Sequence, residues 1–141
     1  MKPTVLLLLF AALAAGCSKE SGGEYTTNCS EETIQLSGDF DTDQAELESR
    51  FAEIESMVAN REARRASQCH TMAVGAKSCG GPSTYIIYSS KSVDESELED
   101  LVCYYTAFQR AMNTEYELIS DCALEAAPNI ELVDGNCEIV Y

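Results

Sequence analysis

Residues 92–119, SVDESELEDLVCYYTAFQRAMNTEYELI, carry the pattern that decides the expected fold. Large apolar residues recur there at spacings of three and four, which places them on one face of a helix. They are Leu98, Leu101, Tyr105, Phe108, Met112 and Tyr116. Ser92 followed by Glu95 forms a capping box, which is typical of a helix start. The stretch therefore predicts an amphipathic helix from Ser92 to about Ile119.

A second helix is predicted upstream, from Asp43 to about Ser67. Its apolar stripe consists of Leu47, Phe51, Ile54 and Val58. Asp43 with Glu46 is its candidate capping box, and acids near the start with arginines near the end suit the helix dipole. Because Arg61 and Arg65 continue the same stripe, we expect the contact with the core to end near Val58.

Strand and turn patterns complete the expected fold. Cys79 is followed by Gly80, Gly81 and Pro82, a structural turn, and Tyr85-Ile86-Ile87-Tyr88 then has the composition of a strand. Near the carboxyl end, alternating residues on both sides of Asp134-Gly135 predict a β-hairpin. The expected class is therefore α+β, with two helices packed on a small antiparallel sheet of about three strands and stapled by disulfides.

The amino-terminal segment has the anatomy of a secretory signal. Lys2 precedes the apolar run VLLLLFAALAA at residues 5–15, which is shorter than the about 20 residues of a membrane span. Leu13-Ala14-Ala15-Gly16-Cys17 then resembles the lipobox of bacterial lipoproteins, with Ala14 where leucine is commoner. The resemblance implies cleavage before Cys17 and acylation of this cysteine. An ordinary cleaved signal with a coincidental cysteine is the alternative.

These features predict three segments and a cellular location. Residues 1–16 are a signal peptide that is removed, residues 17–38 are a polar tether that begins at the lipidated Cys17, and residues 39–141 form a single domain. Ser18 resembles the sorting signal of outer-membrane lipoproteins. The expected location is the bacterial cell envelope, with the chain lipid-anchored to the outer membrane on its periplasmic face or at the cell surface.

The charge of the chain restricts its partners. Of 24 acidic and nine basic residues, only Lys2 lies in the predicted signal, so the mature chain has a formal charge of −16. Such a chain repels phosphate backbones and anionic headgroups, which excludes nucleic acid as a partner. A cationic envelope protein, a divalent cation or solubility alone would each fit this charge.

Six further cysteines predict three disulfides in an oxidising compartment. No Cys-x-x-Cys pair is present. Six cysteines allow about 15 pairings, so several connectivities stay open. We expect Cys29–Cys103, because Cys103 lies opposite the apolar stripe and needs a covering segment. We expect Cys122–Cys137 at the hairpin, which leaves Cys69–Cys79.

A resemblance adds to this interpretation. Gly75-x-Lys77-x-Cys79-Gly80-Gly81-Pro82-x-x-Tyr85-x-x-Tyr88-Ser89, followed by Ser120-Asp121-Cys122 and Gly135-x-Cys137, resembles small exported proteins of Gram-negative bacteria that are themselves uncharacterised. Many of them carry a lipobox. The resemblance covers about residues 66–140 and implies a shared fold and export, with no activity attached. Counterparts of Cys69, Cys79, Cys122 and Cys137 recur in these proteins, which implies that Cys29–Cys103 is an added staple.

Few side chains suggest a catalytic or metal-binding role. His70 is the only histidine, and a histidine at a helix end or on the surface explains it without catalysis. Asp39-x-Asp41-x-Asp43 resembles the start of a calcium loop, but Gln44 and Arg50 stand where that loop needs glycine and glutamate. Acids leading into a helix start explain the run without a metal.

Two further clusters have a structural explanation as well. Lys77 beside the turn at residues 79–82 could form an anion-binding nest, or the turn could simply be clamped by a disulfide. A solvated helix face explains the glutamates of the first helix, and no two of them are marked as an acid–base dyad. They are Glu46, Glu48, Glu53 and Glu55. We therefore predict no catalytic residue, no metal site and no cofactor.

The expected function is that of a non-enzymatic envelope lipoprotein that binds another protein or supports the envelope. The alternative is an inhibitor of a cationic hydrolase such as lysozyme, towards which an acidic surface would steer. The familiar membrane-bound lysozyme inhibitors are β-barrels, whereas two long helices are predicted here. An enzyme without a recognisable active site is the third hypothesis.

Overall fold

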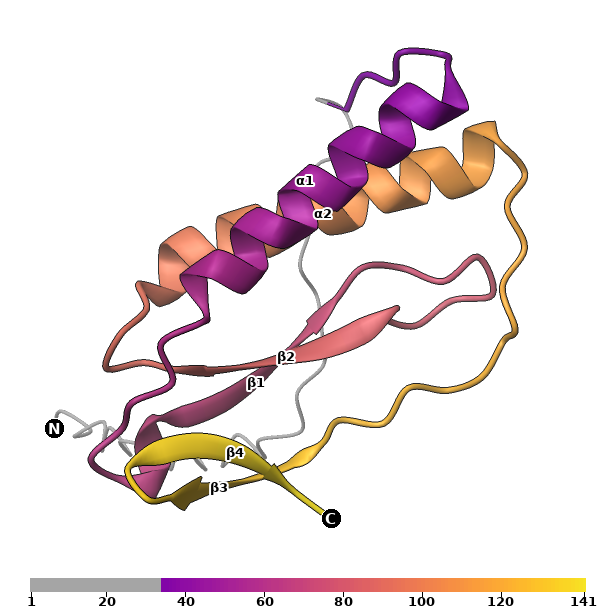
Figure 1. The fold of residues 1–141 in the computed structure, drawn as a ribbon. Coiled ribbons are helices and arrows are strands. Elements are labelled where there is room, and N and C mark those ends of the chain that lie inside the picture. Colours follow the sequence, from indigo (N-terminus) through magenta and orange to yellow (C-terminus); the bar gives the residue numbers. More distant parts are fainter. Residues whose placement is uncertain (1–33) are drawn as a thin grey trace, which may run out of the picture.

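The computed structural model describes residues 34–141. In chain order its elements are α1 (Phe40–Met57), the short 3-10 helix η2 (Ala66–Gln68), β1 (Cys69–Val74), β2 (Thr84–Ser89), α2 (Glu95–Glu115), β3 (Asn129–Val133) and β4 (Asn136–Val140). Figure 1 shows α1 and α2 side by side over the β1–β2 pair, with the β3–β4 hairpin below one end of that pair. The predicted α+β class is confirmed. The strands form two separate two-stranded sheets, where the sequence predicted one sheet of about three strands.

Helix α1 begins before the predicted start. Asp39 is its N-cap, and the carboxylate Oδ1 accepts hydrogen bonds from the backbone N–H of Thr42 at 2.9 Å and from the Thr42 hydroxyl at 2.7 Å. The prediction that Asp43 and Glu46 form the cap is therefore wrong. The predicted stripe is confirmed, because Leu47, Ile54 and Val58 are buried and Phe51 is partly buried.

The chain leaves α1 well before Ser67 because tertiary pairing outweighs local helix propensity. The backbone N–H of Ala63 donates to Gly135 O at 2.8 Å, and that of Cys137 donates to Arg61 O at 2.9 Å. Residues 61–63 therefore lie along β4 as an extra edge. Arg61 and Arg65 are exposed, which agrees with the expected end of core contact near Val58.

Strand β2 contains the predicted strand Tyr85–Tyr88, and its partner β1 was not predicted. The two strands are antiparallel, with Met72 opposite Ile86. Met72, Val74, Ile86 and Tyr88 belong to the core shared with the helices. The face that alternates with them includes Cys69, whose disulfide to Cys137 ties this face to the hairpin.

Helix α2 begins three residues later than predicted. Its N-cap is Asp94, whose carboxylate accepts from the N–H groups of Ser96 and Glu97 at 3.0 and 3.2 Å. Ser92 instead donates its backbone N–H to Ser89 O in a turn, so the predicted Ser92–Glu95 capping box is wrong. The predicted apolar face is confirmed. Leu98, Tyr105, Phe108 and Met112 are buried, and Leu101 and Tyr116 pack against them.

The predicted carboxyl-terminal hairpin is confirmed. Strands β3 and β4 are antiparallel, and Val133 pairs with Asn136 across a two-residue turn. Asp134 and Gly135 have φ values of 48° and 82°. Both residues are thus left-handed, which is the geometry of the type I′ turns that match strand twist.

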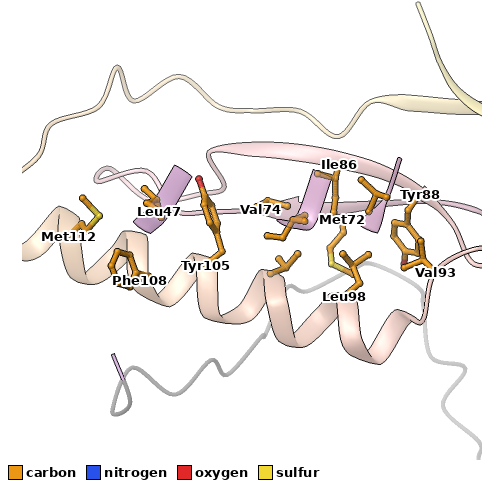
Figure 2. Packing of buried hydrophobic residues seen from close by; sticks show 13 residues of the cluster. Leu47, Met72, Val74, Ile86, Tyr88, Val93, Leu98, Tyr105, Phe108 and Met112 are labelled. Carbon is orange, nitrogen blue, oxygen red and sulfur yellow. The ribbon is translucent and has the colours of Figure 1, made fainter. Parts of the chain in front are cut away.

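The core lies between α2, α1 and the β1–β2 sheet. Figure 2 shows Leu47, Phe108 and Met112 gathered at one end of α2, and Tyr88, Val93 and Leu98 at the other. Leu98, Ile54 and Val74 have no exposed surface. One continuous apolar cluster therefore joins the two helices to the sheet.

Two disulfides differ from the predicted connectivity. Cys69 pairs with Cys137 and Cys79 pairs with Cys122, so the predicted Cys69–Cys79 and Cys122–Cys137 are wrong. The physical reason is that residues 61–63 pair with β4 and so bring Cys137 next to the start of β1. The segment between α2 and β3 passes the end of the β1–β2 loop in Figure 1, where Cys122 meets Cys79.

The remaining cysteine predictions involve residues 1–33. Cys103 is disulfide-bonded. Cys29 and the predicted lipidation site Cys17 lie outside the described residues. The Cys29–Cys103 pairing and the acylation of Cys17 therefore stay predictions.

A buried carboxylate joins the start of α1 to the end of α2. Asp43 is 3% exposed, and it accepts hydrogen bonds from the Tyr116 hydroxyl at 2.5 Å and from Ser37 N–H at 2.9 Å. Burial opposes the charge of Asp43, but the hydrogen bonds from Tyr116, Ser37 and Gly38 outweigh it and lower its pKa. The hydrogen bond to Asp43 and burial raise the pKa of Tyr116 to about 12. The pair is therefore formed by a charged carboxylate and a neutral phenol.

Replacing Tyr116 with phenylalanine should destabilise the fold in a defined pH window. The lowered pKa of Asp43 makes its contribution present above its unfolded value of 3.8 and lost at lower pH. The raised pKa of Tyr116 makes its contribution complete below its unfolded value of 10.0 and lost as the pH rises to about 12. Urea unfolding of both proteins should give a stability difference that is constant between these limits and shrinks outside them. A difference independent of pH across both limits would contradict this pairing.

Candidate functional site

Side chains of α2 hold the loop between β1 and β2. Gln109 Oε1 accepts hydrogen bonds from Ala76 N–H at 2.7 Å and from the Ser83 hydroxyl at 2.8 Å. Asn113 Nδ2 donates to Ala76 O at 2.8 Å, and Thr106 Oγ1 accepts from Gly75 N–H at 3.0 Å. These polar residues of α2 thus fix the loop in one position over the helix.

The loop is also fixed from outside. Lys77 Nζ donates to Asp121 at 3.0 Å, Ala123 O at 2.8 Å and Glu125 at 2.9 Å. The hydrogen bonds to Glu125 and then Asp121 raise the pKa of Lys77. The Lys77 charge is therefore already paired with two carboxylates of the segment that follows α2, which argues against the anion-nest hypothesis.

The turn at residues 79–82 takes the structural form that the sequence indicated. Gly80 N–H donates to Lys77 O at 2.9 Å, and Lys77 N–H donates to Gly81 O at 3.0 Å. The positive φ values of Gly80 and Gly81 permit this tight turn. Cys79 clamps it to Cys122.

His70 lies on β1 and not at a helix end. Its ring stacks on Tyr88 with centroids 5.3 Å apart, and Nε2 lies 3.3 Å from the Ser90 hydroxyl. Cys69 beside it is bonded to Cys137. Cys69 therefore cannot act as a thiolate nucleophile beside His70, because its sulfur is oxidised.

The acids at the start of α1 have separate structural roles. Asp39 caps the helix and Asp43 bonds to Tyr116, while Asp41 is exposed. Across residues 34–141, no three His, Cys, Asp or Glu side chains are grouped so that they could hold a metal ion. The Asp39-x-Asp41-x-Asp43 run is thus explained by helix capping and tertiary bonding.

The glutamates of α1 lie in three different surroundings. Glu46 forms an ion pair with Arg50, with Oε1 and Nη2 2.6 Å apart, and the guanidinium lies 3.9 Å from the centroid of the Tyr104 ring. Glu53 is exposed. Glu48 and Glu55 line a groove on another side of the helix. The predicted solvated face therefore has two carboxylates that border a concave surface.

This groove is the candidate binding site, and we call it the α1 groove. It has a volume of about 350 Å³ and is lined by residues of α1, α2 and the segment after α2. Its lining residues are Gln44, Leu47, Glu48, Phe51, Ala52, Glu55, Tyr105, Gln109, Met112, Asn113 and Leu118. The volume lies within the range of about 300–1,000 Å³ that is usual for ligand pockets. Apolar side chains with a few amides and carboxylates give it the composition of a binding surface.

The sequence predicted only some of the residues that line this site. The predicted apolar stripes supply Leu47 and Phe51 from α1 and Tyr105 and Met112 from α2, and the sequence predicts the glutamates as a solvated helix face. Gln109, Asn113 and Leu118 were not singled out, because their place beside α1 depends on how the two helices pack. The only sequence signal for the polar residues was their spacing. A polar residue three or four positions from the apolar stripe of α2 lies beside that stripe on the helix.

Comparisons with protein-family models, curated proteins and solved structures found no match. Within residues 34–141, none of the helices has the length and apolar character needed to span a bilayer.

Proposed function

We propose that this chain is an envelope lipoprotein, anchored by acylated Cys17, whose domain at residues 39–141 binds another protein without catalysing a reaction. The signal-like residues 1–16 and the lipobox support the anchor. Cys69–Cys137 and Cys79–Cys122 fit an oxidising compartment such as the envelope. The resemblance to small exported proteins supports export, and Ser18 after the lipobox supports the outer membrane as the location.

The observation that carries the binding role is the composition of the α1 groove. Phe51 and Leu118 remain partly exposed in it, so a ligand could cover apolar surface there. Gln109 and Asn113 are held by bonds to the β1–β2 loop, which fixes the shape of the groove before a ligand arrives. A rigid, partly apolar groove with charged borders is suited to recognition of a partner surface.

Photo-crosslinking in membranes of producing cells tests both parts of this proposal. A photo-reactive amino acid at Ala52, which is exposed and lines the groove, should give a discrete adduct with a partner protein in the membrane fraction. The same residue at Glu99, on the exposed side of α2, should give none. Cys17→Ser should move the chain to the soluble fraction, since the acyl chains provide the anchor.

The outcomes separate the anchor from the binding role. Retention of Cys17→Ser in membranes, or a mass without acyl groups on the wild-type chain, would refute the anchor. Equal adducts from positions 52 and 99, or none from position 52, would refute the groove as the binding surface.

The acidic border of the groove favours a second candidate, an inhibitor of a cationic hydrolase. Glu48 and Glu55 are exposed there, and a basic enzyme would be steered towards them. A lysozyme assay at micromolar concentrations of the chain decides this case. Unchanged lysozyme activity would remove lysozyme as the target.

A further inference from the structure

We propose that the α1 groove binds an arginine or lysine side chain that projects from the partner protein. The proposal rests on the proposed binding function and names the chemistry of the occupant. It combines an apolar floor, two bordering carboxylates and the shape of the wall between them.

The floor of the groove suits the aliphatic part of such a side chain. Phe51 and Leu118 are partly exposed there, and the buried core residue Met112 also lines the groove. Arginine and lysine place their methylene groups on apolar surface while the charged end reaches towards polar groups. A floor without a charged group can therefore take the stem but not the head of the side chain.

Two carboxylates line the same groove and could bind the charged head. Glu48 and Glu55 are seven residues apart on α1, which is about two helical turns or 10 Å. Ala52 lies between them on the same side of α1 and lines the groove with a single methyl group. A side chain entering over Ala52 would have a carboxylate on each side.

Neither of the two bordering carboxylates takes part in an ion pair among the described residues. Glu46 is already paired with Arg50. Glu48 accepts a neutral hydrogen bond from Gln44 Nε2 at 2.9 Å, which leaves its charge uncompensated by that contact. The border of the groove is therefore complementary to a cation.

Asn113 of α2 also lines the groove and has a side-chain acceptor. Asn113 uses Nδ2 to donate to Ala76 O, and among the described residues its Oδ1 accepts no hydrogen bond. An arginine guanidinium has five donors, so it can use a carboxylate and an amide oxygen together. This makes arginine the better of the two occupants.

The test is an NMR titration of the mature, lipidated chain in uncharged detergent micelles. The probe is the capped peptide acetyl-Gly-Arg-Leu-Arg-Gly-amide, and the control peptide has citrulline in place of each arginine. Binding of the arginine peptide should shift the side-chain amide signals of Gln109 and Asn113. The citrulline peptide has the same shape without the charge, so it should cause much smaller shifts.

Matched variants locate the charges that matter. Glu48→Gln with Glu55→Gln should weaken binding of the arginine peptide about five- to tenfold, because two partly exposed ion pairs are lost. Glu53→Gln with Glu99→Gln removes the same net charge outside the groove and should change the affinity less than about twofold.

Several outcomes would overturn the proposal. Equal binding of the citrulline peptide would mean that the cation is not recognised. Equal weakening by the two pairs of variants would mean that the whole acidic surface attracts the peptide. In either case a crosslink at position 52 would leave the proposed binding function standing, whereas absence of that crosslink would refute the function and not only the occupant.

Discussion

A variant with Cys69→Ser and Cys137→Ser should lose roughly 5 kcal/mol of stability, which is enough to unfold many domains of this size. The disulfide closes a loop with a sequence separation of 68 residues, so its removal increases the entropy of the unfolded chain. That change alone should cost about 4 kcal/mol. Cys137 has no exposed surface, so a serine there would also bury a hydroxyl group.

The matched control is Cys79→Ser with Cys122→Ser. This disulfide has a separation of 43 residues, and both cysteines are exposed. The chain-entropy cost is about 4 kcal/mol here as well, but serine hydroxyls at these positions would be solvated, so the expected loss is smaller by about the cost of the buried hydroxyl group. Guanidinium unfolding monitored by circular dichroism measures both losses. An equal or larger loss in the control would show that burial of Cys137 adds nothing.

The second large effect is expected for Gly75→Ala. Gly75 has a φ of +77°, and a Cβ atom there would lie 2.3 Å from Gln109 Oε1 and 2.9 Å from the Ser83 hydroxyl. Left-handed backbone alone costs about 1–2 kcal/mol for alanine. The clash would also displace the amide oxygen that binds Ala76 and Ser83, at about 1 kcal/mol for each lost bond. The expected loss is therefore about 3 kcal/mol or more.

Gly80→Ala separates the clash from the backbone strain. Gly80 has a φ of +96°, and a Cβ atom there would have nothing within 4 Å. Its expected cost is the backbone term alone, about 1–2 kcal/mol. Urea unfolding of the two variants should give clearly different midpoints. Identical midpoints would mean that the added Cβ atom does not displace Gln109 from the loop.

The Gly75 variant also links stability to the candidate site. Gln109 is both the residue that holds the β1–β2 loop and a wall of the α1 groove. Displacing its side chain should change the groove as well as the loop. Reduced binding of the arginine peptide by Gly75→Ala, beyond that of Gly80→Ala, is therefore consistent with the proposed site.

The sequence alone determined those features that depend on neighbouring residues. The apolar stripes of α1 and α2 follow from the spacing of residues such as Leu47, Ile54, Leu98 and Phe108, since a helix places such residues on one side. The Asp134-Gly135 turn follows from the ability of these residues to adopt positive φ. The same local rules predicted the strand at residues 85–88 and the α+β class.

Only the tertiary structure decided the end of α1, the disulfide partners and the groove. Residues 61–63 lie along β4 because Gly135 and Cys137 offer them backbone hydrogen bonds, although their own sequence continues a helical pattern. That pairing places Cys137 beside Cys69, and the segment after α2 places Cys122 beside Cys79. The groove combines Glu48 and Glu55 of α1 with Asn113 of α2 and Leu118 beyond it. These features depend on contacts between residues distant in sequence, which periodicity and turn propensity do not encode.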